Sequence, residues 1–329
     1  KEYEKANTYY LRALEIQELL DEENPKAFRP DLATILNNLG ANCDDLKEYQ
    51  KANTYYLRAL EIRELLAKEN PKAFRPGLAD ILYNLGLNYK TLTEYEKANT
   101  YFLRALEIQE LLAKENPKAF RPDLANTLSY LGYNYSDLEE YQKANTYYLR
   151  ALEIRELLAK ENPKAFRPDL TNILNRIGVN YNCLQEYEKA NIYFLRALEI
   201  QELLAIENPK VFRPNLAGIL YNLGLNYKTL TEYEKANTYF LRALEIQELL
   251  AIENPKAFRP DLANTLNNLG INYNYLKEYE KANTYFLRAL EIRELLANEN
   301  PKAFRPDLAS ILYNLGVNYN YLKEYEKAN

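Results

Sequence analysis

The sequence predicts an all-α protein, a right-handed superhelical α-solenoid of stacked antiparallel helix pairs. Three observations predict it. The chain of 329 residues repeats itself at a fixed interval, its apolar residues recur at helical spacing, and no segment shows the two-residue alternation of a β-strand. A fixed period of a few tens of residues is typical of arrays whose units bury their apolar faces only by stacking on their neighbours.

The period is 46 residues. The pair Glu2-Tyr3 returns as Glu48-Tyr49, 46 residues later (48 − 2), and the same interval separates every later copy. Seven periods leave residues 323–329, which repeat the first seven residues letter for letter. We therefore expect the whole chain, 1–329, to form a single array of seven periods plus the start of an eighth. We also expect it to be a window of a longer chain.

Each period is predicted to hold a longer helix, as in residues 94–115. This segment is rich in Leu, Ala, Glu and Arg, which are good helix formers, and has no Gly or Pro inside it. Tyr95 and Phe102 lie on its inner side. Asn116-Pro117 is expected to end it, because a residue before proline is biased out of the α region.

The shorter helix is predicted to start at the second proline of the loop that follows, as at Pro122. Proline suits the first helical position, and the acid Asp123 beside it favours the positive end of the helix dipole. All 14 prolines are assigned to such loops, two in each, so none is expected to interrupt a helix. Each loop also holds a Phe, such as Phe120, which we interpret as a peg that packs into the neighbouring repeat.

The stretch 81–89 of the shorter helix carries a packing stripe. Leu82, Leu85, Gly86 and Tyr89 fall at positions i, i+3, i+4 and i+7, which form one face of an α-helix. The glycine in the stripe indicates a point where another helix comes close.

These residues resemble the tetratricopeptide repeat family. Its motif has a large apolar residue, Leu, Gly and Tyr on the first helix, and a small, an aromatic and a small residue on the second. The matching residues are Leu82, Leu85, Gly86, Tyr89, Ala98, Phe102 and Ala105. The period of 46 exceeds the usual length of about 34, and Glu110 replaces the usual closing proline. Both features are similar to the long-helix, kinesin light chain-like type. The resemblance implies a superhelix whose short helices line a concave groove, and it leaves the ligand unnamed.

A second stripe on the shorter helix is predicted to be the wall of this groove. Its positions differ from repeat to repeat, whereas the packing positions barely change. Such variation is expected of a recognition surface, and neutral drift at exposed positions stays open as the alternative. The predicted peptide or partner groove comprises Asp80, Tyr83, Asn84, Leu87, Asn88, Lys90, Tyr130, Tyr133, Arg176, Tyr221, Asn222, Lys228, Asn268, Tyr313 and Asn314.

One position of this helix never varies. It is occupied by Asn42, Asn88, Asn134, Asn180, Asn226, Asn272 and Asn318. A ladder of amides has the donors and acceptors to hold an extended peptide backbone. The interpretation favoured for a constant position is that each Asn ties one helix to the next hairpin.

Composition argues against an enzyme, a metal site and a cofactor site. The chain has no His, the commonest general base and transition-metal ligand, and no Gly-rich phosphate loop. Its two cysteines, Cys43 and Cys183, stand in different repeats and do not predict a disulfide framework. The net charge is −5, with basic residues spread among acids, so nucleic acid is not an expected partner. No apolar run reaches the roughly 18 residues of a membrane span, so no membrane insertion is expected either.

Two functions follow from these observations. The first is a non-enzymatic protein–protein interaction scaffold that binds an extended peptide or helix in the concave groove. The second is a self-assembling structural array or fibre, built by end-to-end stacking of near-identical repeats without polar caps. The partner is therefore a protein or peptide, or other copies of the chain. The sequence leaves the compartment open.

Overall fold

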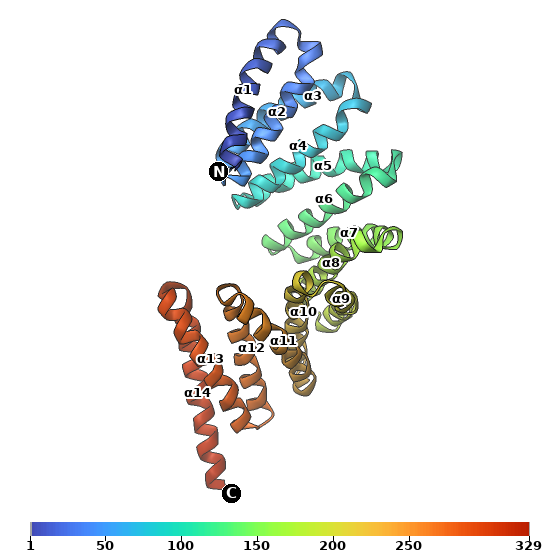
Figure 1. The fold of residues 1–329 in the computed structure, drawn as a ribbon. Helices are drawn as coiled ribbons and strands as arrows, with labels where there is room; N and C mark the ends of the chain where they lie inside the picture. Colours follow the sequence, from blue (N-terminus) through green and yellow to red (C-terminus); the bar gives the residue numbers. More distant parts are fainter. Residues whose placement is uncertain (1, 329) are drawn as a thin grey trace. The chain divides into compact units, whose positions relative to one another are not determined.

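The computed structural model describes residues 2–328, which are helical apart from short connections and contain no strand. Helices follow one another along the chain in two compact units, Lys1–Pro163 and Lys164–Asn329 (Figure 1). The first unit contains α1 (Glu2–Glu23), α2 (Pro25–Asp45), α3 (Tyr49–Glu69), α4 (Pro71–Thr91), α5 (Tyr95–Glu115), α6 (Pro117–Asp137) and α7 (Tyr141–Glu161). The second contains α8 (Pro163–Cys183), α9 (Tyr187–Glu207), α10 (Pro209–Thr229), α11 (Tyr233–Glu253), α12 (Pro255–Tyr275), α13 (Tyr279–Glu299) and α14 (Pro301–Ala328).

The predicted all-α stack of antiparallel helix pairs is confirmed within each unit. We call the even-numbered helices A helices and the odd-numbered helices B helices. Within a unit, A helices pack against the B helices next to them in sequence, as α4 does against α3 and α5, and successive A helices also touch, as α2 with α4 and α10 with α12 do. That a single array runs through both units stays a prediction.

The predicted start of the A helices was wrong. In α6 the helix begins at Pro117, the first proline of the pair, and Pro122 lies inside it. Asn116 caps the helix, its Oδ1 accepting a hydrogen bond of 3.3 Å from the backbone N–H of Ala119. Proline therefore does occupy the first helical position. The proline that does so is Pro117 and not Pro122. Phe120 consequently lies on the helix rather than in a loop, and the B helix α5 and the A helix α6 have equal lengths of 21 residues.

A sharp turn joins each A helix to the B helix that follows. Its central residue has a left-handed backbone without being glycine; Thr93 has φ 60° and Lys47 has φ 62°. This conformation is strained for residues with a Cβ, above all for β-branched ones. The turn is repeated at Lys47, Thr93, Glu139, Gln185, Thr231 and Lys277.

The packing stripe forms the core, as predicted. Leu82 and Leu85 are fully buried on α4, and Phe102 is fully buried on α5. A Cβ added to Gly86 would lie 2.5 Å from the Phe102 ring, so the glycine is required for this approach. In the second unit Phe240 and Phe286 occupy the same place in a cluster that also includes Phe258, one of the predicted pegs.

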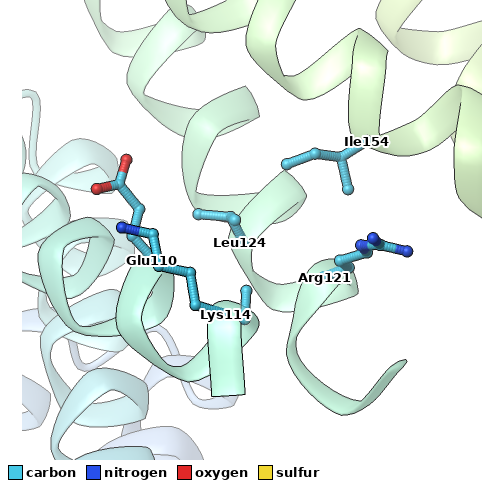
Figure 2. Close-up of a pocket in the computed structure, with 6 residues that line it drawn as sticks. Glu110, Lys114, Arg121, Leu124 and Ile154 are labelled. Carbon is cyan, nitrogen blue, oxygen red and sulfur yellow. The ribbon is translucent and has the colours of Figure 1, made fainter. Parts of the chain in front are cut away.

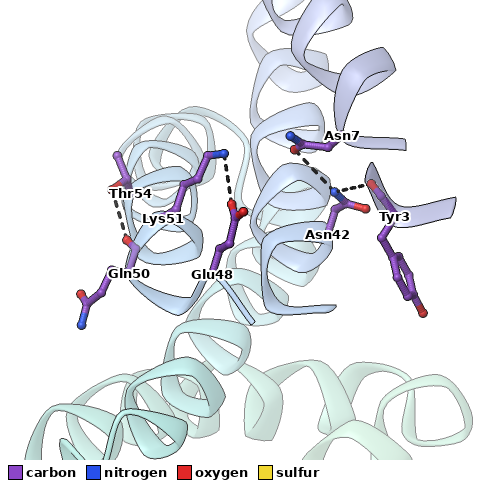
Figure 3. Close-up of polar contacts among 7 residues, drawn as sticks. All are labelled: Tyr3, Asn7, Asn42, Glu48, Gln50, Lys51 and Thr54. Atoms are coloured by element: carbon purple, nitrogen blue, oxygen red, sulfur yellow. Dashed lines mark hydrogen bonds and ion pairs between the residues drawn. The ribbon is translucent and has the colours of Figure 1, made fainter. Parts of the chain in front are cut away.

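The constant Asn position ties helices together, as favoured from the sequence. Asn42 Nδ2 on α2 donates to the backbone carbonyl of Tyr3 at 3.1 Å and to Asn7 Oδ1 at 3.5 Å, both on α1 (Figure 3). The bonds lead to the preceding B helix rather than to the following hairpin. The same pair of bonds is made by Asn134, Asn226, Asn272 and Asn318.

The outer faces of the B helices carry a ladder of ion pairs. Arg104 on α5 binds Glu64 on α3, and Arg58 Nη2 lies 2.5 Å from Glu18 Oε1. These side chains are well exposed, so each pair contributes only about 0.2–1 kcal/mol.

The described helices include none that is long and apolar enough to cross a membrane.

Candidate interaction site on the A helices

The residues of the second stripe lie on one face of the A helices, where several of them contact a neighbouring A helix of the same unit. Tyr83 on α4 meets Tyr130 on α6 edge to face, with ring centroids 5.7 Å apart. Asn84 Nδ2 on α4 donates to Asn37 Oδ1 on α2 at 3.1 Å. Lys90 on α4 forms an ion pair with Asp137 on α6. The stripe is therefore a continuous surface of side chains, which we call the A-helix face.

Aromatic rings make up much of this face in the first unit. Tyr130 and Tyr133 lie 5.5 Å apart, and Tyr133 lies 5.5 Å from Tyr148 of α7. Tyr83 also contacts Phe102, at 5.9 Å between centroids. The rings of Tyr83, Tyr130 and Tyr133 are rigid and half-buried, and their hydroxyls give them polar ends, so they suit contact with a partner at low entropic cost.

One pocket of about 510 Å³ opens on this face, and we call it the Leu87 pocket. It brings together four predicted residues with three others. The lining consists of Asp44, Tyr49, Leu87, Asn88, Lys90, Thr91 and Tyr130. Apolar, aromatic, amide and charged groups thus meet within one cavity, which is the composition of a site for a peptide side chain.

Asn88 differs in its hydrogen bonds from Asn42, Asn134, Asn226, Asn272 and Asn318. It is 1% exposed, and its Nδ2 donates to Asp44 Oδ1 instead of to a backbone carbonyl. Asp44 Oδ2 also accepts a hydrogen bond of 2.8 Å from the Tyr56 hydroxyl. Burial raises the pKa of Asp44, and the two hydrogen bonds oppose that shift. The Asp44 carboxylate therefore accepts the hydrogen bond that Asn42 gives to a backbone carbonyl in its own repeat. Asn88 at the same time lines the Leu87 pocket.

A second, smaller pocket of about 30 Å³ lies farther along α4, and we call it the Asp80 pocket. It is lined by Asp80, Tyr83, Gln109, Asp123 and Asn126. Desolvation raises the pKa of Asp80, and the negative charge of Asp123 raises it further. Desolvation likewise raises the pKa of Asp123. Two acids thus line the same pocket, and both remain accessible to solvent.

Sequence reasoning missed Gln109, Asp123 and Asn126 as site residues. Gln109 belongs to a B helix, which had been interpreted as core on one side and solvated on the other. The available signal was the variation of its position, which holds Gln in four repeats and Arg in three. Such variation at a largely buried position was a signal that the repeats differ here in their polar contacts.

In the second unit the predicted residues form a polar network. Asn222 Nδ2 on α10 donates to Asn175 Oδ1 on α8 at 3.1 Å. Lys228 Nζ donates to Asn268 Oδ1 at 2.7 Å, and Asn268 Nδ2 donates to the Tyr221 hydroxyl at 3.1 Å. Burial lowers the pKa of the Lys228 ammonium. This part of the face offers donors and acceptors, whereas the first unit offers aromatic rings.

The remaining predicted residues lie at the more open positions of the face. Arg176 on α8 is exposed, and Tyr313 on α14 is 72% exposed. Asn314 is half-buried, and its Nδ2 donates to Asn267 Oδ1 at 3.0 Å. In the second unit the structure thus joins Tyr221, Lys228 and Asn268 directly, and it leaves Arg176 and Tyr313 at exposed positions.

A third pocket, of about 360 Å³, lies off the A-helix face and was not predicted. Figure 2 shows the charged side chains of Glu110, Lys114 and Arg121 around Leu124 and Ile154. Glu110 is paired with Arg150, and Arg121 Nη1 lies 3.4 Å from Glu161 Oε1. Two of its three charges are therefore already neutralised.

Over the residues that the structure describes, no cluster of acidic, Cys or His side chains fits a metal ion.

Stacked helix pairs with a variable side-chain face define a helical repeat protein of the α-solenoid class. The chain belongs to the tetratricopeptide repeat family. Models with that description match residues 1–64, 216–295, 261–329, 79–110 and 124–163. A model described as a WhiA LAGLIDADG-like domain also matches residues 151–210, but these residues form helices of the same repeat pattern and no separate domain. The finer resemblance to the kinesin light chain-like type stays a prediction.

Solved structures show the same fold. BtubC (BKLC) from P. vanneervenii is 25% identical with a TM-score of 0.59, and the match covers 74% of this chain and 90% of that one. The apo form of RapI is 18% identical with a TM-score of 0.57, over 90% and 99% of the two chains. The PH0952 protein of Pyrococcus horikoshii, a signal transduction ATPase with a tetratricopeptide repeat sensor, is 18% identical with a TM-score of 0.60. That match covers 98% of this chain and 47% of the other. No curated protein sequence matches significantly.

Tetratricopeptide repeats are generally non-catalytic modules of protein interaction. The chain is accordingly a protein-interaction scaffold.

Proposed function

We propose that the chain binds an extended peptide, or a helix of a partner protein, along its A-helix face. The observation that carries the proposal is the Leu87 pocket, where four residues of the predicted groove line one cavity on this face. Leu87 and Tyr130 offer apolar contact, while Thr91 and Lys90 offer polar groups at the rim. A peptide presents the same mixture of side chain and backbone groups, so the pocket complements it.

Amide side chains support the proposal along the rest of the face. Asn84, Asn222 and Asn314 are half-buried, and each donates one hydrogen bond to the Asn of the A helix before it. Each retains unused donor and acceptor capacity toward solvent, which is what a peptide backbone requires.

The test uses a displayed library of random twelve-residue peptides selected against the purified chain. Enriched peptides are then titrated calorimetrically against the chain and against a variant with Asn84→Ala, Asn222→Ala and Asn314→Ala. We expect at least a tenfold loss of affinity with an unchanged thermal unfolding midpoint. Arg104→Ala, on the outer face of α5, is the matched control and should bind as the unaltered chain does. Equal affinity of the triple variant and the chain would contradict binding on this face.

A further inference from the structure

One B-helix position sends its side chain between two A helices and differs among the repeats in charge. Its residues are Gln17, Arg63, Gln109, Arg155, Gln201, Gln247 and Arg293. Three of the repeats thus carry a cation here, and four carry a neutral amide.

The Arg repeats show what the cation does. Arg293 on α13 is 2% exposed; its Nη2 donates to Asn264 Oδ1 on α12, and its Nη1 lies 3.0 Å from Asp307 Oδ2 on α14. Arg63 Nη2 donates to the Thr34 hydroxyl at 2.7 Å in the same way. The guanidinium therefore satisfies polar groups on the A helices before and after it.

Around Gln109 the acids are present, and the cation of this repeat position is replaced by a neutral amide. Cations of the neighbouring repeats lie nearby, because the charge of Arg63 lowers the pKa of Asp80, against the desolvation that raises it, and Arg155 Nη2 donates to Asn126 Oδ1 at 2.8 Å. Asp80 stands 29 residues before Gln109 and Asp123 stands 14 after it, the same offsets at which Asn264 and Asp307 flank Arg293. Both acids line the Asp80 pocket together with Gln109. In the part of the chain that the structure describes, neither carboxylate has a basic group within ion-pair distance.

The amide of Gln109 is also incompletely bonded. The side chain is 3% exposed, and its Oε1 has no hydrogen-bond partner in the structure. Gln247 Oε1 likewise has no partner, whereas Gln17 and Gln201 donate their amide N–H groups to the carbonyls of Phe28 and Phe212, at 2.9 and 2.8 Å. A buried acceptor without a donor costs about 1–3 kcal/mol. A group that brought N–H donors into the pocket would remove that cost.

We propose that the Asp80 pocket binds the cationic head group of a Lys or Arg side chain of the partner peptide, in the place that Arg293 fills in its own repeat. The inference rests on the proposed function and names the chemistry of one subsite. Asp80 and Asp123 supply the charge, Gln109 Oε1 accepts a hydrogen bond, and Tyr83 lines the pocket with an aromatic ring suited to a cation. A volume of about 30 Å³ is that of about one water molecule, so an ammonium group fits the pocket as it stands and a guanidinium requires the lining side chains to move apart.

The neighbouring Gln repeats do not offer this combination. Gln201 is flanked at the same offsets by Asn172 and Asn215, neither of which is charged. Gln247 is flanked by Gly218 and Asp261, a single acid. The Asp80 pocket thus fixes where along the face a basic residue of the ligand binds.

The first experiment uses N-acetyl arginine methylamide and N-acetyl lysine methylamide as probes, with the uncharged citrulline derivative as control. Side-chain amide signals of Gln109 and Asn126 are followed by NMR on the full chain. We expect saturable shifts with one or both cationic probes, none with citrulline, and at least a tenfold weaker affinity in Asp80→Asn/Asp123→Asn. Shifts that citrulline reproduces, or that the double variant retains, would overturn the inference.

The second experiment introduces a cationic side chain of the chain itself into the Asp80 pocket. Gln109→Arg recreates the arrangement of Arg293 and should abolish probe binding while raising the thermal unfolding midpoint. Gln247→Arg, beside Gly218, is the matched control and should leave probe binding unchanged. Probe binding that survives in Gln109→Arg would place the probes elsewhere and overturn the inference.

The two proposals fail separately. If selected peptides lose affinity in the triple Asn variant but contain no basic residue, and the probes do not bind, this inference fails and the proposed function stands. If the probes bind the Asp80 pocket but no selected peptide depends on the Asn residues, the proposed groove function fails instead.

Discussion

The ring of Phe102 lies directly on the backbone of Gly86. A Cβ at Gly86 would stand 2.5 Å from two atoms of that ring, closer than real Cβ contacts come. A glycine inside a helix costs about 1 kcal/mol relative to alanine, and here the loss is offset by a fully buried aromatic ring. The contact joins an A helix to the following B helix and recurs along both units.

Two glycines of α10 should respond oppositely to alanine. Gly224 faces Phe240 in the same way as Gly86 faces Phe102, with a Cβ position 2.5 Å from the ring, so Gly224→Ala should lower the free energy of unfolding by about 1–3 kcal/mol. Gly218 has nothing within 4 Å, so Gly218→Ala should raise it by about 1 kcal/mol. Urea unfolding followed by circular dichroism measures both; effects of the same sign would contradict the packing described.

The constant Asn residues should be structural rather than ligand-binding. Asn226 is 1% exposed, and its Nδ2 donates to the Tyr187 carbonyl at 2.8 Å and to Asn191 Oδ1 at 2.7 Å. Asn226→Ala removes both bonds and should cost about 1–3 kcal/mol of unfolding free energy. Asn222→Ala, one turn earlier and half-buried, is the control and should cost less than about 1 kcal/mol. The reverse order in denaturant unfolding would show that the ladder does not hold the helices together.

The acids of the Asp80 pocket should make stability depend on pH. Burial raises the pKa of both Asp80 and Asp123, so their ionisation is less favourable in the folded chain than in the unfolded chain. The stability that they contribute is complete below the ordinary Asp pKa of about 3.9 and is lost as the pH rises through the raised values. Asp80→Asn/Asp123→Asn should therefore stabilise the chain at neutral pH.

The pH dependence of that gain is the measurement. Urea unfolding of the double variant and of the unaltered chain is compared at neutral pH and below the ordinary Asp pKa, where both carboxyls are protonated. The gain should shrink toward zero in acid. An equal gain at both pH values would mean that it does not come from ionisation.

The turns between A and B helices should tolerate glycine better than threonine. Thr231 has φ 60°, a left-handed conformation that costs a residue with a Cβ about 1–2 kcal/mol. Thr231→Gly should therefore raise the thermal unfolding midpoint. Thr238→Gly serves as the control, because Thr238 lies inside α11 with its hydroxyl donating to the Glu234 carbonyl at 3.0 Å; this change should lower the midpoint. A lower midpoint for both variants would contradict a strained turn.

The periodicity of the sequence predicted the first and last residues of a helix well where only one residue could begin or end it. The B helix α5 begins within one residue of the expected position and ends where Asn116 precedes proline. The start of α6 was misplaced because either proline of the pair suits the first helical position. The Asn116 side chain decides between them by capping the helix five residues earlier.

By itself the sequence determined the period, the all-α fold, the packing stripe with Gly86, and the variable stripe on which binding is proposed. These features depend on neighbours three, four or 46 residues apart, which are visible as a pattern. Only the tertiary structure decided that Asn88 turns to Asp44, and that Asp80, Gln109 and Asp123 share one pocket. Such groupings bring together side chains of three different helices. Their charge and burial arise only when those helices pack, because the low-dielectric space between helices does not exist in the extended chain.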